Sequence, residues 1–437
     1  MRMYDLIQKK KEGKVLTTEE INYIIRNYTD GTIPDYQMSA MLMAVCFQGM
    51  DDRETYDLTI AIRDSGEIMD LSEIHGLKAD KHSTGGVGDK TTLVLAPILG
   101  ALGVKVAKMS GRGLGFTGGT IDKLECFPGF STAIPREKFI GNVNAIGLAI
   151  AGQTADLAPG DKKLYALRDV TATVDQMSLI ASSIMSKKLA SGSDIIVLDV
   201  KTGSGAFMKT FDDAKALADI MVNIGTLAGK AVSAIITDMD QPLGNAVGNS
   251  LEVIEAVEAL SDQGPEDLME VVYALGSEIL VLAGKAKDRE CAEQIMRECV
   301  QNGSAKKKFA EFVSAQGGDS SYVWETDRFP KTMYVEEVEA KQAGYVAGIQ
   351  AELVGNACMA LGGGRETKDS EIDLSVGIRL KRKKGMAVKE GEPLAVIYGN
   401  DREKTERAKE QLLLAYHITG DAPEKEPMVK LRISPEK

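Results

Sequence analysis

The sequence predicts an α/β plus all-α protein: a small helical domain, a larger α/β domain with a mixed or parallel sheet, and a C-terminal α+β domain. Helical patterns fill the first 65 residues, and β-rich and helical segments then alternate from residue 78 to about 330. Short β-rich runs separated by glycines follow. At 437 residues the chain is too long for one ordinary core. The expected domains are residues 1–65 with an insertion at 161–190, residues 78–156 with 191–330, and residues 331–437.

Helix signals begin the chain. Thr17 followed by Glu20 predicts a capping box, and Asp51 with Glu54 predicts the start of a further helix that ends near residue 66. Between them, apolar residues recur at helical spacing and predict one packing face, made of Met38, Met41, Leu42 and Val45. Residues 161–190 are also largely helical in pattern, and we expect them to return to these N-terminal helices.

The middle of the chain alternates between strand and helix. The runs LKADKH, VKVAKM, GLAIAG, IIVLDV and AIITDM are rich in β-forming residues, and helical stretches such as FDDAKALADIMVNIG separate them. This alternation predicts a parallel sheet covered by helices on both faces. After about residue 330 the runs become short and alternating, which predicts a small β-rich domain. The basic run from Lys381 to Lys384 is expected to be a solvated turn in it.

The composition and net charge of the chain argue against several classes of partner. The net charge of −12 argues against nucleic acid and anionic membrane as partners. No apolar run approaches the roughly 20 residues that span a bilayer, and the first residues lack a signal-peptide core with a small-residue cleavage site. We therefore expect a cytoplasmic protein whose five cysteines stay reduced. A bound phosphate would have to be attracted by a local concentration of lysine.

A first glycine-rich segment, DKHSTGGVGDKTT, follows the run LKADKH at residues 80–92. Glycines allow the backbone N–H groups to converge on an anion, and the helix that starts near Thr91 adds its positive end. Lys81, Ser83 and Thr92 supply a charge and hydroxyl donors suited to phosphate. The segment lacks the GK[ST] ending of a P-loop and the GxGxxG of a dinucleotide fold. Taken alone, it fits an anion site or a plain structural turn equally well.

A second segment, KMSGRGLGFTGGTIDKLE at residues 108–125, repeats this arrangement. A strand leads into five glycines with the hydroxyls of Ser110, Thr117 and Thr120, and a helix follows. Two anion-binding loops at the ends of adjacent strands would converge at the carboxyl edge of the sheet, where α/β proteins bind their ligands. Convergence of the two loops favours the anion site over the structural turn.

A third segment, LRDVTATVDQMSLIASSIMSKK, does not have the pattern of a phosphate site. Ser183 and Lys187 are four residues apart and share a helix face, and Arg168 lies at the other end of the same helical stretch. Together they are suited to grip a flat heterocycle with carbonyl acceptors. A solvated, charged helix face is the alternative interpretation.

The segment SGRGLGFTGGTIDKLE closely resembles the signature of the thymidine and pyrimidine-nucleoside phosphorylases, and DKHSTGGVGD and ALRDVTATVD…SSIMSKK resemble two further blocks of that family in the same order. The resemblance implies a homodimer in which an α/β domain closes over a cleft against the helical domain. We expect the hinge in the connections 66–78 and 153–160, because Gly66, Gly76 and Pro159-Gly160 interrupt the pattern there.

By position, the resemblance implies specific ligand contacts. The implied phosphate contacts are Lys81, Ser83, Thr92, Lys108, Ser110 and Thr120. The implied base contacts are His82, Arg168, Ser183 and Lys187. A potassium ion is also implied, held by oxygens, mostly backbone carbonyls, of Gly88, Lys90, Leu243, Ala246 and Glu255.

Three positions depart from the pattern of the family that the sequence resembles, and of these Phe116, near the phosphate loop, bears on substrate preference. Phe116 stands where the family usually has His, Cys126 where it often has Ser, and Lys90 where Thr is commoner. Lys90 is expected to serve the ion through its carbonyl only. Lys108 resembles the broad enzymes of the family and favours uridine, thymidine and deoxyuridine as substrates over a strict preference for thymidine.

The resemblance implies phosphorolysis, in which phosphate captures the sugar as the base leaves. His82 would give a proton to the base. Arg168 and Lys187 would stabilise its negative charge. An anthranilate-type phosphoribosyltransferase is one alternative, but it needs an acidic magnesium motif, for which Asp122 and Glu125 are the only nearby candidates. A non-catalytic nucleoside-binding protein is the other.

Overall fold

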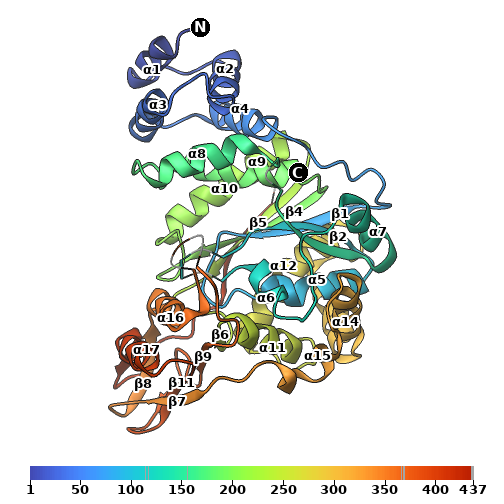
Figure 1. The fold of residues 1–437 in the computed structure, drawn as a ribbon, viewed down its shortest axis with the longest axis vertical. Helices are drawn as coiled ribbons and strands as arrows, with labels where there is room; N and C mark the ends of the chain where they lie inside the picture. The colour runs from blue at the N-terminus through green and yellow to red at the C-terminus, as the bar shows by residue number, and fades with distance from the viewer. Residues whose placement is uncertain (114, 117, 155, 366, 368–369, 435–437) are drawn as a thin grey trace.

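Six helices form one end of the molecule, next to the N-terminus (Figure 1). The computed structural model describes residues 1–113, 115–116, 118–154, 156–365, 367 and 370–434. The six helices are α1 (Met3–Lys11), α2 (Thr18–Thr29), α3 (Asp35–Gln48), α4 (Asp52–Arg63), α8 (Pro159–Asp169) and α9 (Met177–Ala190). Leu164 and Leu179 lie in the same apolar cluster as Ile21, Ile25 and Leu42, so the inserted helices share a core with the N-terminal ones.

The capping box expected at Thr17 is confirmed, and the helix expected to start at Asp51 with Glu54 begins with a second one. The Oγ1 of Thr17 accepts from the N–H of Glu20 at 3.3 Å, and Oδ1 of Asp51 accepts from the N–H of Glu54 at 2.6 Å. Glu54 also forms a buried ion pair with Lys10, whose Nζ lies 2.8 Å from Oε2. Side-chain oxygens thus satisfy the free N–H groups at the start of α2 and α4 and fix where each helix begins.

A six-stranded sheet forms the middle of the molecule, in the order β13-β5-β4-β1-β2-β3. Five parallel strands make up most of it: β1 (Lys78–Ser83), β2 (Lys105–Ser110), β3 (Leu148–Gly152), β4 (Ile195–Thr202) and β5 (Ala231–Asp238). The parallel sheet inferred from the alternating pattern is therefore confirmed. The edge strand β13 (Val429–Ile433) is antiparallel to β5 and makes the sheet mixed.

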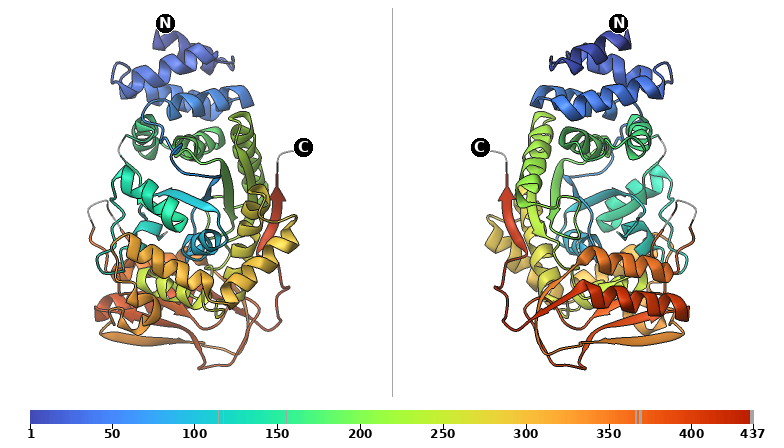
Figure 2. Two further views of the ribbon diagram at one scale, coloured as in Figure 1. Left: turned by 90° about the vertical axis from the view of Figure 1, so that its right-hand side faces the viewer. Right: turned by 90° about the vertical axis from the view of Figure 1, so that its left-hand side faces the viewer.

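Helices cover both faces of this sheet (Figure 2). On one face α5 (Thr91–Ala101), α11 (Asn249–Ala259) and α12 (Glu266–Leu282) share the largest apolar core with the strands. On the other face α9 and α10 (Phe211–Leu227) pack against β4 and β5. The remaining helices here are α6 (Thr120–Leu124), α7 (Arg136–Ile146), α13 (Arg289–Gln301), α14 (Ser304–Ala315), α15 (Ser321–Trp324) and the 3-10 turn η1 (Thr326–Arg328).

The C-terminal part contains two small antiparallel sheets, ordered β6-β9-β11-β7 and β10-β8-β12. Their strands are β6 (Ala246–Val247), β7 (Tyr334–Glu339), β8 (Gly344–Ile349), β9 (Gly377–Leu380), β10 (Ala387–Val388), β11 (Pro393–Gly399) and β12 (Tyr416–Thr419). The helices α16 (Ala351–Cys358) and α17 (Arg402–Ala415) pack against each other there, with the π-helical turn η2 (Met359–Gly363) after α16. Within the described residues, no helix is long and apolar enough to cross a membrane.

Three expectations about this region need correction. The segment 429–433 does not stay with the rest of 331–437 but completes the central sheet as β13. Conversely, β6 comes from the α/β segment and pairs with β9 of the C-terminal sheet. Lys383, expected in a solvated turn, is buried and forms an ion pair with Asp267 at 2.8 Å. Short alternating runs do not indicate which sheet they join, and a run of basic residues does not show which of them faces inward.

Candidate active site

The two glycine-rich loops start at the carboxyl ends of neighbouring strands. β1 and β2 are adjacent and parallel, with Lys78 opposite Lys105 and Ala79 opposite Val106. The first loop leads from β1 into α5 and the second from β2 into α6. The predicted neighbourhood of the two strands is therefore confirmed, and both loops lie at the sheet edge where ligands of α/β proteins bind.

Asp80 connects the two strands and the helix α9 at this edge. Its side chain is fully buried, and Oδ1 lies 3.0 Å from Nζ of Lys108 while Oδ2 lies 2.7 Å from Nζ of Lys188. Burial raises the pKa of Asp80, but the ammonium groups of Lys108 and Lys188 outweigh it and lower that pKa to about 2. Burial, together with the neighbouring ammonium of Lys188, lowers the pKa of Lys108 to about 8 despite Asp80.

Lys81 lies in a second group of buried charges beside the first. Its Nζ donates to Oγ1 of Thr91 and lies 3.3 Å from Oδ2 of Asp199 and 3.5 Å from Oδ2 of Asp89. Asp199 also pairs with Lys201 at 2.7 Å. Taking both groups together, four ammonium groups share three carboxylates: Lys81, Lys108, Lys188 and Lys201 with Asp80, Asp89 and Asp199. The excess positive charge favours an anion at this edge of the sheet, in a chain whose net charge is −12.

The four hydroxyl groups expected to bind phosphate lie where a strand ends or a helix begins. Ser83 and Ser110 are the last residues of β1 and β2, and Thr92 and Thr120 lie in the first turns of α5 and α6. The Oγ of Ser83 accepts from the N–H of Gly85 at 3.2 Å. Thr117, a further candidate in the second loop, lies outside the described residues.

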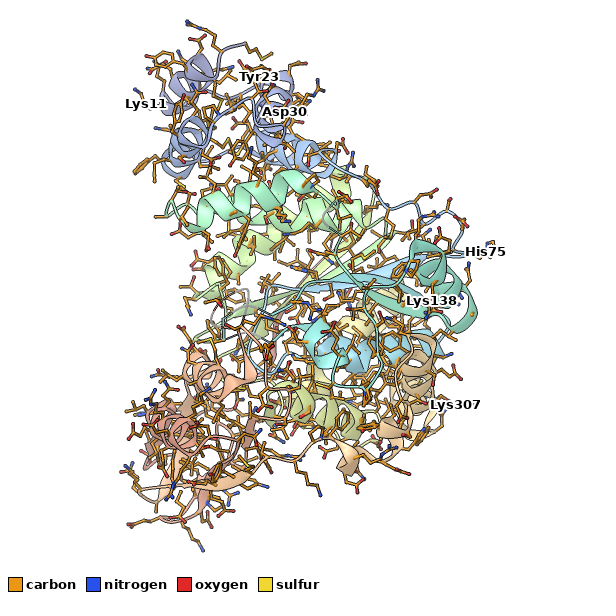
Figure 3. All side chains as sticks on the ribbon, viewed as in Figure 1. Lys11, Tyr23, Asp30, His75, Lys138 and Lys307 are labelled. Atoms are coloured by element: carbon orange, nitrogen blue, oxygen red, sulfur yellow. The ribbon has the colours of Figure 1, made fainter. Side chains whose placement is uncertain are left out.

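His82, in β1, has a neutral imidazole. Its Nε2 is buried and has no hydrogen-bond partner among the described residues. Burial, with the ammonium groups of Lys188 and Lys108 nearby, lowers the pKa of His82 well below its ordinary value. His75, by contrast, lies exposed at the periphery of the molecule (Figure 3). The buried Nε2 of His82 is an unpaired polar atom beside the first glycine-rich loop.

Arg168 is held by backbone oxygens at the junction of α8 and α9. Its Nε, Nη1 and Nη2 donate to the carbonyl oxygens of Thr173 at 3.1 Å, Leu179 at 3.1 Å and Val174 at 2.6 Å. Burial lowers the pKa of Arg168, but a guanidinium stays charged in proteins. An arginine has five N–H donors, so this arrangement fixes the side chain and leaves donors for a ligand.

Lys187 and Ser183 share one face of α9, as their spacing predicted. The Nζ of Lys187 lies 3.4 Å from Oγ of Ser183 and forms an ion pair with Oδ2 of Asp161 at 2.7 Å. Oδ1 of Asp161 is buried without a partner among the described residues. Lys188, the next residue, connects α9 to Asp80 of β1. This contact brings α9, which carries Ser183 and Lys187, to β1, the strand that carries Lys81 and Ser83.

Sequence reasoning missed the residues that hold the candidate ligands in place. Asp80 and Lys188 lie directly beside the candidate ligands Lys81 and Lys187, as in ADKH and SKK. Asp161 is 26 residues from its partner Lys187, and no sequence signal joins the two. A buried or partly buried lysine needs an acidic partner that neutralises its charge before its ligand binds, and Asp80 and Asp161 meet this need.

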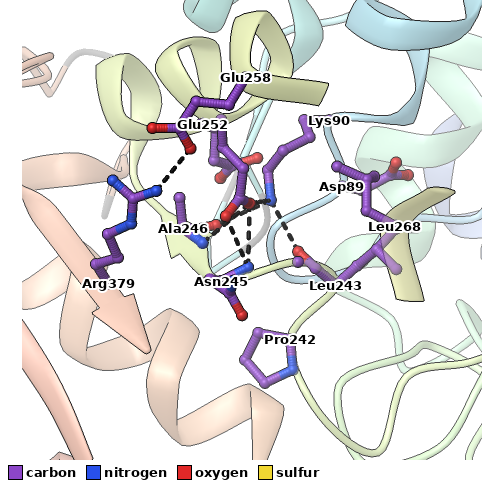
Figure 4. Close-up of polar contacts among 12 residues, drawn as sticks. Asp89, Lys90, Pro242, Leu243, Asn245, Ala246, Glu252, Glu258, Leu268 and Arg379 are labelled. Carbon is purple, nitrogen blue, oxygen red and sulfur yellow. Dashed lines mark hydrogen bonds and ion pairs between the residues drawn. The ribbon is translucent and has the colours of Figure 1, made fainter. Parts of the chain in front are cut away.

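Three of the five residues expected to hold a potassium ion have oxygens that contact a lysine side chain instead (Figure 4). The Nζ of Lys90 donates to the carbonyl oxygens of Leu243 at 2.8 Å and Ala246 at 3.0 Å, and to Oε2 of Glu255 at 2.7 Å. The carbonyl oxygen of Gly88 accepts from the backbone N–H of Lys90 at 2.9 Å. Burial lowers the pKa of Lys90, but Glu255 and its neighbour Glu252 outweigh this effect and raise it. The position where these oxygens converge is therefore occupied by a permanent cation.

Comparisons with known proteins agree along the whole chain. Family models match residues 4–66 (glycosyl transferase family, helical bundle domain), 75–306 (glycosyl transferase family, a/b domain) and 345–419 (pyrimidine nucleoside phosphorylase C-terminal domain). The pyrimidine-nucleoside phosphorylase of Geobacillus stearothermophilus is 54% identical over 434 residues, 99% of this chain and 100% of the relative. That of Bacillus subtilis (strain 168) is 57% identical over 400 residues, 92% of each chain.

The chain belongs to the pyrimidine-nucleoside phosphorylase family. The resemblance found in the three sequence blocks is thus confirmed, and membership makes the protein a pentosyltransferase. A solved anthranilate phosphoribosyltransferase (TrpD) from Thermus thermophilus has a TM-score of 0.56 at 18% identity, covering 71% of this chain and 98% of that one. That likeness shows a common fold and carries no argument for a common reaction.

The structure describes the surroundings of Lys90 and Phe116. Lys90 was expected to offer only a carbonyl to a potassium ion, which is wrong, because its side chain fills that position. Phe116 is half-buried where the second loop meets the C-terminal domain, and it lines a cavity of about 20 Å³ with Gly88 and Gly355. Phe116 therefore lies against α16 of the C-terminal domain.

Proposed function

We propose that this member of the family catalyses the reversible phosphorolysis of uridine, thymidine and deoxyuridine to the free base and ribose or deoxyribose 1-phosphate. The observation that carries the proposal is the bridge from Lys188 through Asp80 to Lys108. It brings a candidate base-binding helix and a candidate phosphate-binding strand to the same place, with contacts of 2.7 and 3.0 Å. Relatives that are 53–57% identical and are named pyrimidine-nucleoside phosphorylases support it.

Phosphate binding is assigned to the edge between β1 and β2. A phosphate dianion there would meet ammonium groups from Lys81 and Lys108, the hydroxyls of Ser83, Ser110, Thr92 and Thr120, and the amides of two glycine-rich loops. Because the lysines are already paired with aspartates, no isolated charge is buried before phosphate arrives. The phosphate then competes for donors that the aspartates keep in position.

The base is assigned to the α8–α9 side. Breaking the bond between the sugar and the base places positive charge on the sugar and negative charge on the departing pyrimidine. Arg168 and Lys187 carry full charges and are held by carbonyl oxygens and by Asp161. Charges fixed before the reaction stabilise the leaving anion most effectively, because no reorganisation is needed as the anion forms. Ser183, bonded to Lys187, would add a neutral donor to the pyrimidine carbonyls.

His82 is assigned a role that depends on bound phosphate. In the free protein its imidazole is neutral because burial and two ammonium groups lower its pKa. A phosphate dianion beside it would oppose those ammonium groups and favour the imidazolium form. We therefore propose that His82 gains its proton together with phosphate and passes it to the departing base.

The phosphoribosyltransferase alternative has little support from the two acidic residues that it needs. Asp122 Oδ1 lies 3.0 Å from Arg112 and 2.8 Å from Arg365, and Oδ2 accepts from the N–H of Gly113 at 2.8 Å. Glu125 pairs with Arg112 at 2.6 Å. Carboxylates neutralised in this way by arginines are poor candidates for ligands of a magnesium ion.

The homodimer is also part of the proposal. Three large apolar side chains of α3 are exposed on one face at helical spacing: Tyr36, Met43 and Phe47, of which Phe47 is 79% exposed. A contiguous exposed apolar stripe of this kind is typical of a subunit interface. Phe47→Glu is expected to yield monomers in light scattering, whereas Tyr4→Glu on α1 tests whether the interface extends there. A monomeric wild type would contradict this part.

Cytoplasmic location, for which composition is the only support, stays an expectation.

The reaction is tested by mixing the protein with uridine, thymidine, deoxyuridine or cytidine and following nucleoside absorbance with and without phosphate. We expect phosphate-dependent loss of the first three nucleosides and none of cytidine. Turnover of thymidine alone would replace the proposal with a strict thymidine phosphorylase. Binding of uridine without release of uracil would indicate a non-catalytic nucleoside-binding protein. Turnover of phosphoribosyl pyrophosphate with anthranilate, and none of uridine, would establish the phosphoribosyltransferase.

A further inference from the structure

We propose that the ammonium group of Lys90 is a built-in replacement for a monovalent metal ion, so that this chain folds and works without potassium. The inference concerns the cation that holds the first glycine-rich loop, and it stands apart from the identity of the substrate.

The oxygens around Lys90 form a cation site by their chemistry. Two are backbone carbonyls, from Leu243 and Ala246, and the third belongs to the buried carboxylate of Glu255. Hard monovalent cations are bound by such oxygens. The primary amine presents three N–H donors, and each of the three oxygens receives one. The lysine therefore uses its full hydrogen-bonding capacity in place of a metal coordination shell.

Burial makes a cation necessary here. The side chains of Lys90 and Glu255 are 0% and 1% exposed. The carboxylate also accepts from the backbone N–H groups of Asn245 and Ala246 at 3.0–3.1 Å, so it is held in place as an anion. Removing the positive partner of a buried pair leaves an uncompensated charge, which is strongly destabilising. Some cation must stand opposite Glu255 for the loop to keep this conformation.

The backbone packs closely around Lys90 and Glu255. A Cβ added to Gly244 would lie 2.9 Å from Nζ of Lys90 and 2.4 Å from Oε2 of Glu255. A Cβ added to Gly88 would lie 2.5 Å from the carbonyl oxygen of Leu243. Both glycines have positive φ values, of 69° and 73°, which other residues rarely adopt. The first glycine-rich loop and residues 242–246 thus meet at two glycines. A metal ion bound by the same oxygens would take the position that the ammonium group of Lys90 now holds.

The position of Lys90 gives this replacement a consequence for the site. It is the last residue of the first glycine-rich loop, directly before α5 begins at Thr91, and its side chain ties that loop to residues 242–246. A bound potassium ion would order the loop only where its concentration is high enough to fill the site. A tethered ammonium orders it at any salt composition.

The experiment compares the melting temperature (Tm) of wild type and Lys90→Thr in KCl, NaCl and choline chloride at one ionic strength. Wild type is expected to give the same Tm in all three salts. Lys90→Thr is expected to lose several degrees in choline, because Glu255 is left unpaired, and to recover in KCl along a saturable curve. Lys10→Thr is the matched control, since it removes the partner of another buried carboxylate, Glu54, to which the Nζ of Lys10 donates at both oxygens. It should be destabilised equally in all three salts.

Crystals soaked in rubidium chloride provide a second readout that does not depend on stability. An anomalous peak at the Nζ position in Lys90→Thr, with none in wild type, supports the inference. A potassium-specific rise in the Tm of wild type, or rubidium at these oxygens in wild type, would overturn it. So would a Lys90→Thr protein that stays equally unstable in every salt. If Lys90→Thr does not fold, the wild-type measurements still decide the question.

Discussion

Lys188 of α9 donates to Oδ2 of Asp80 in β1 at 2.7 Å, across the boundary between the helical and α/β domains. The other oxygen of the same carboxylate accepts from Lys108 of β2. One buried aspartate therefore sets the distance between a candidate base-binding helix and a candidate phosphate-binding strand. Each lysine has one further acceptor, the carbonyl oxygen of Lys81 for Lys108 and that of Met109 for Lys188.

Asp80→Asn is expected to lower stability in a pH-dependent way. The folded-state pKa of Asp80 is about 2, below its ordinary value of 3.8, so its charge contributes stability that is present above pH 4 and lost as the pH falls toward 2. The difference in pKa corresponds to about 2 kcal/mol. Melting temperatures of wild type and variant should converge as the pH falls from 6 to 2.5. Asp219→Asn, which breaks an exposed pair with Lys215, should change little at either pH. A constant gap between wild type and Asp80→Asn would contradict the assigned charge.

Affinity for phosphate is expected to fall above about pH 8. The pKa of Lys108 in the phosphate-free protein is about 8, so this group loses its positive charge as the pH rises through that value. Steady-state kinetics should show an increase in KM for phosphate between pH 7 and 9.5. In Lys108→Arg, whose guanidinium stays charged, the increase should disappear even if the absolute KM differs. An unchanged pH profile in that variant would assign the titration to another group.

Lys187→Ala is expected to lower kcat by about 100-fold or more, because it removes a charge used mainly as the base departs. Lys163→Ala is the matched control on the preceding helix, since its Nζ donates to the carbonyl of Tyr28 and lies over the ring of that residue. It should keep the wild-type kcat. A Lys187→Ala enzyme with normal turnover would remove this residue from the mechanism.

Arg168 needs a different substitution, because three backbone carbonyls depend on it. Arg168→Ala should lower both kcat and Tm. Arg168→Lys keeps a positive charge but loses the planar donor arrangement. If Arg168 contacts the base, Arg168→Lys should lose turnover with a smaller loss of Tm than Arg168→Ala. Equal losses of Tm in both variants with normal kcat in Arg168→Lys would indicate a purely structural role.

Gly66→Ala tests the expected hinge. The two connections proposed as hinges lie side by side: the N–H of Glu67 donates to the carbonyl of Asp156 at 2.9 Å, and a Cβ on Gly66 would lie 2.2 Å from that same oxygen and from Cδ of Pro159. The variant must separate the two connections. We expect a lower kcat and a changed domain arrangement in small-angle scattering with phosphate and uridine. Gly141→Ala, where an added Cβ meets no atom of the described residues within 4 Å, is the control.

Local features of this chain were predictable, and features that join distant segments were not. The capping residues Thr17 and Asp51 act within four residues of themselves, and the parallel strands follow from alternation along the chain. Two glycine-rich loops could be placed together because consecutive strands of a parallel sheet end at one edge. The contact of Lys90 with Ala246, by contrast, spans 156 residues. A contact between residues so far apart leaves no periodic pattern in the sequence. The position of Lys90 alone suggested a carbonyl ligand, whereas the structure places its ammonium group there.

The antiparallel pairing of β13 with β5 also matters for how this protein is handled. Removing residues 429–433 would uncover the backbone N–H and carbonyl groups on the outer side of β5 from Ala234 to Thr237. An uncovered edge of this kind recruits strands from other molecules and leads to aggregation. Purification tags are therefore better attached before α1 than near β13, and truncations are better placed there too. The loss of a few residues of β13 would expose an unpaired strand edge.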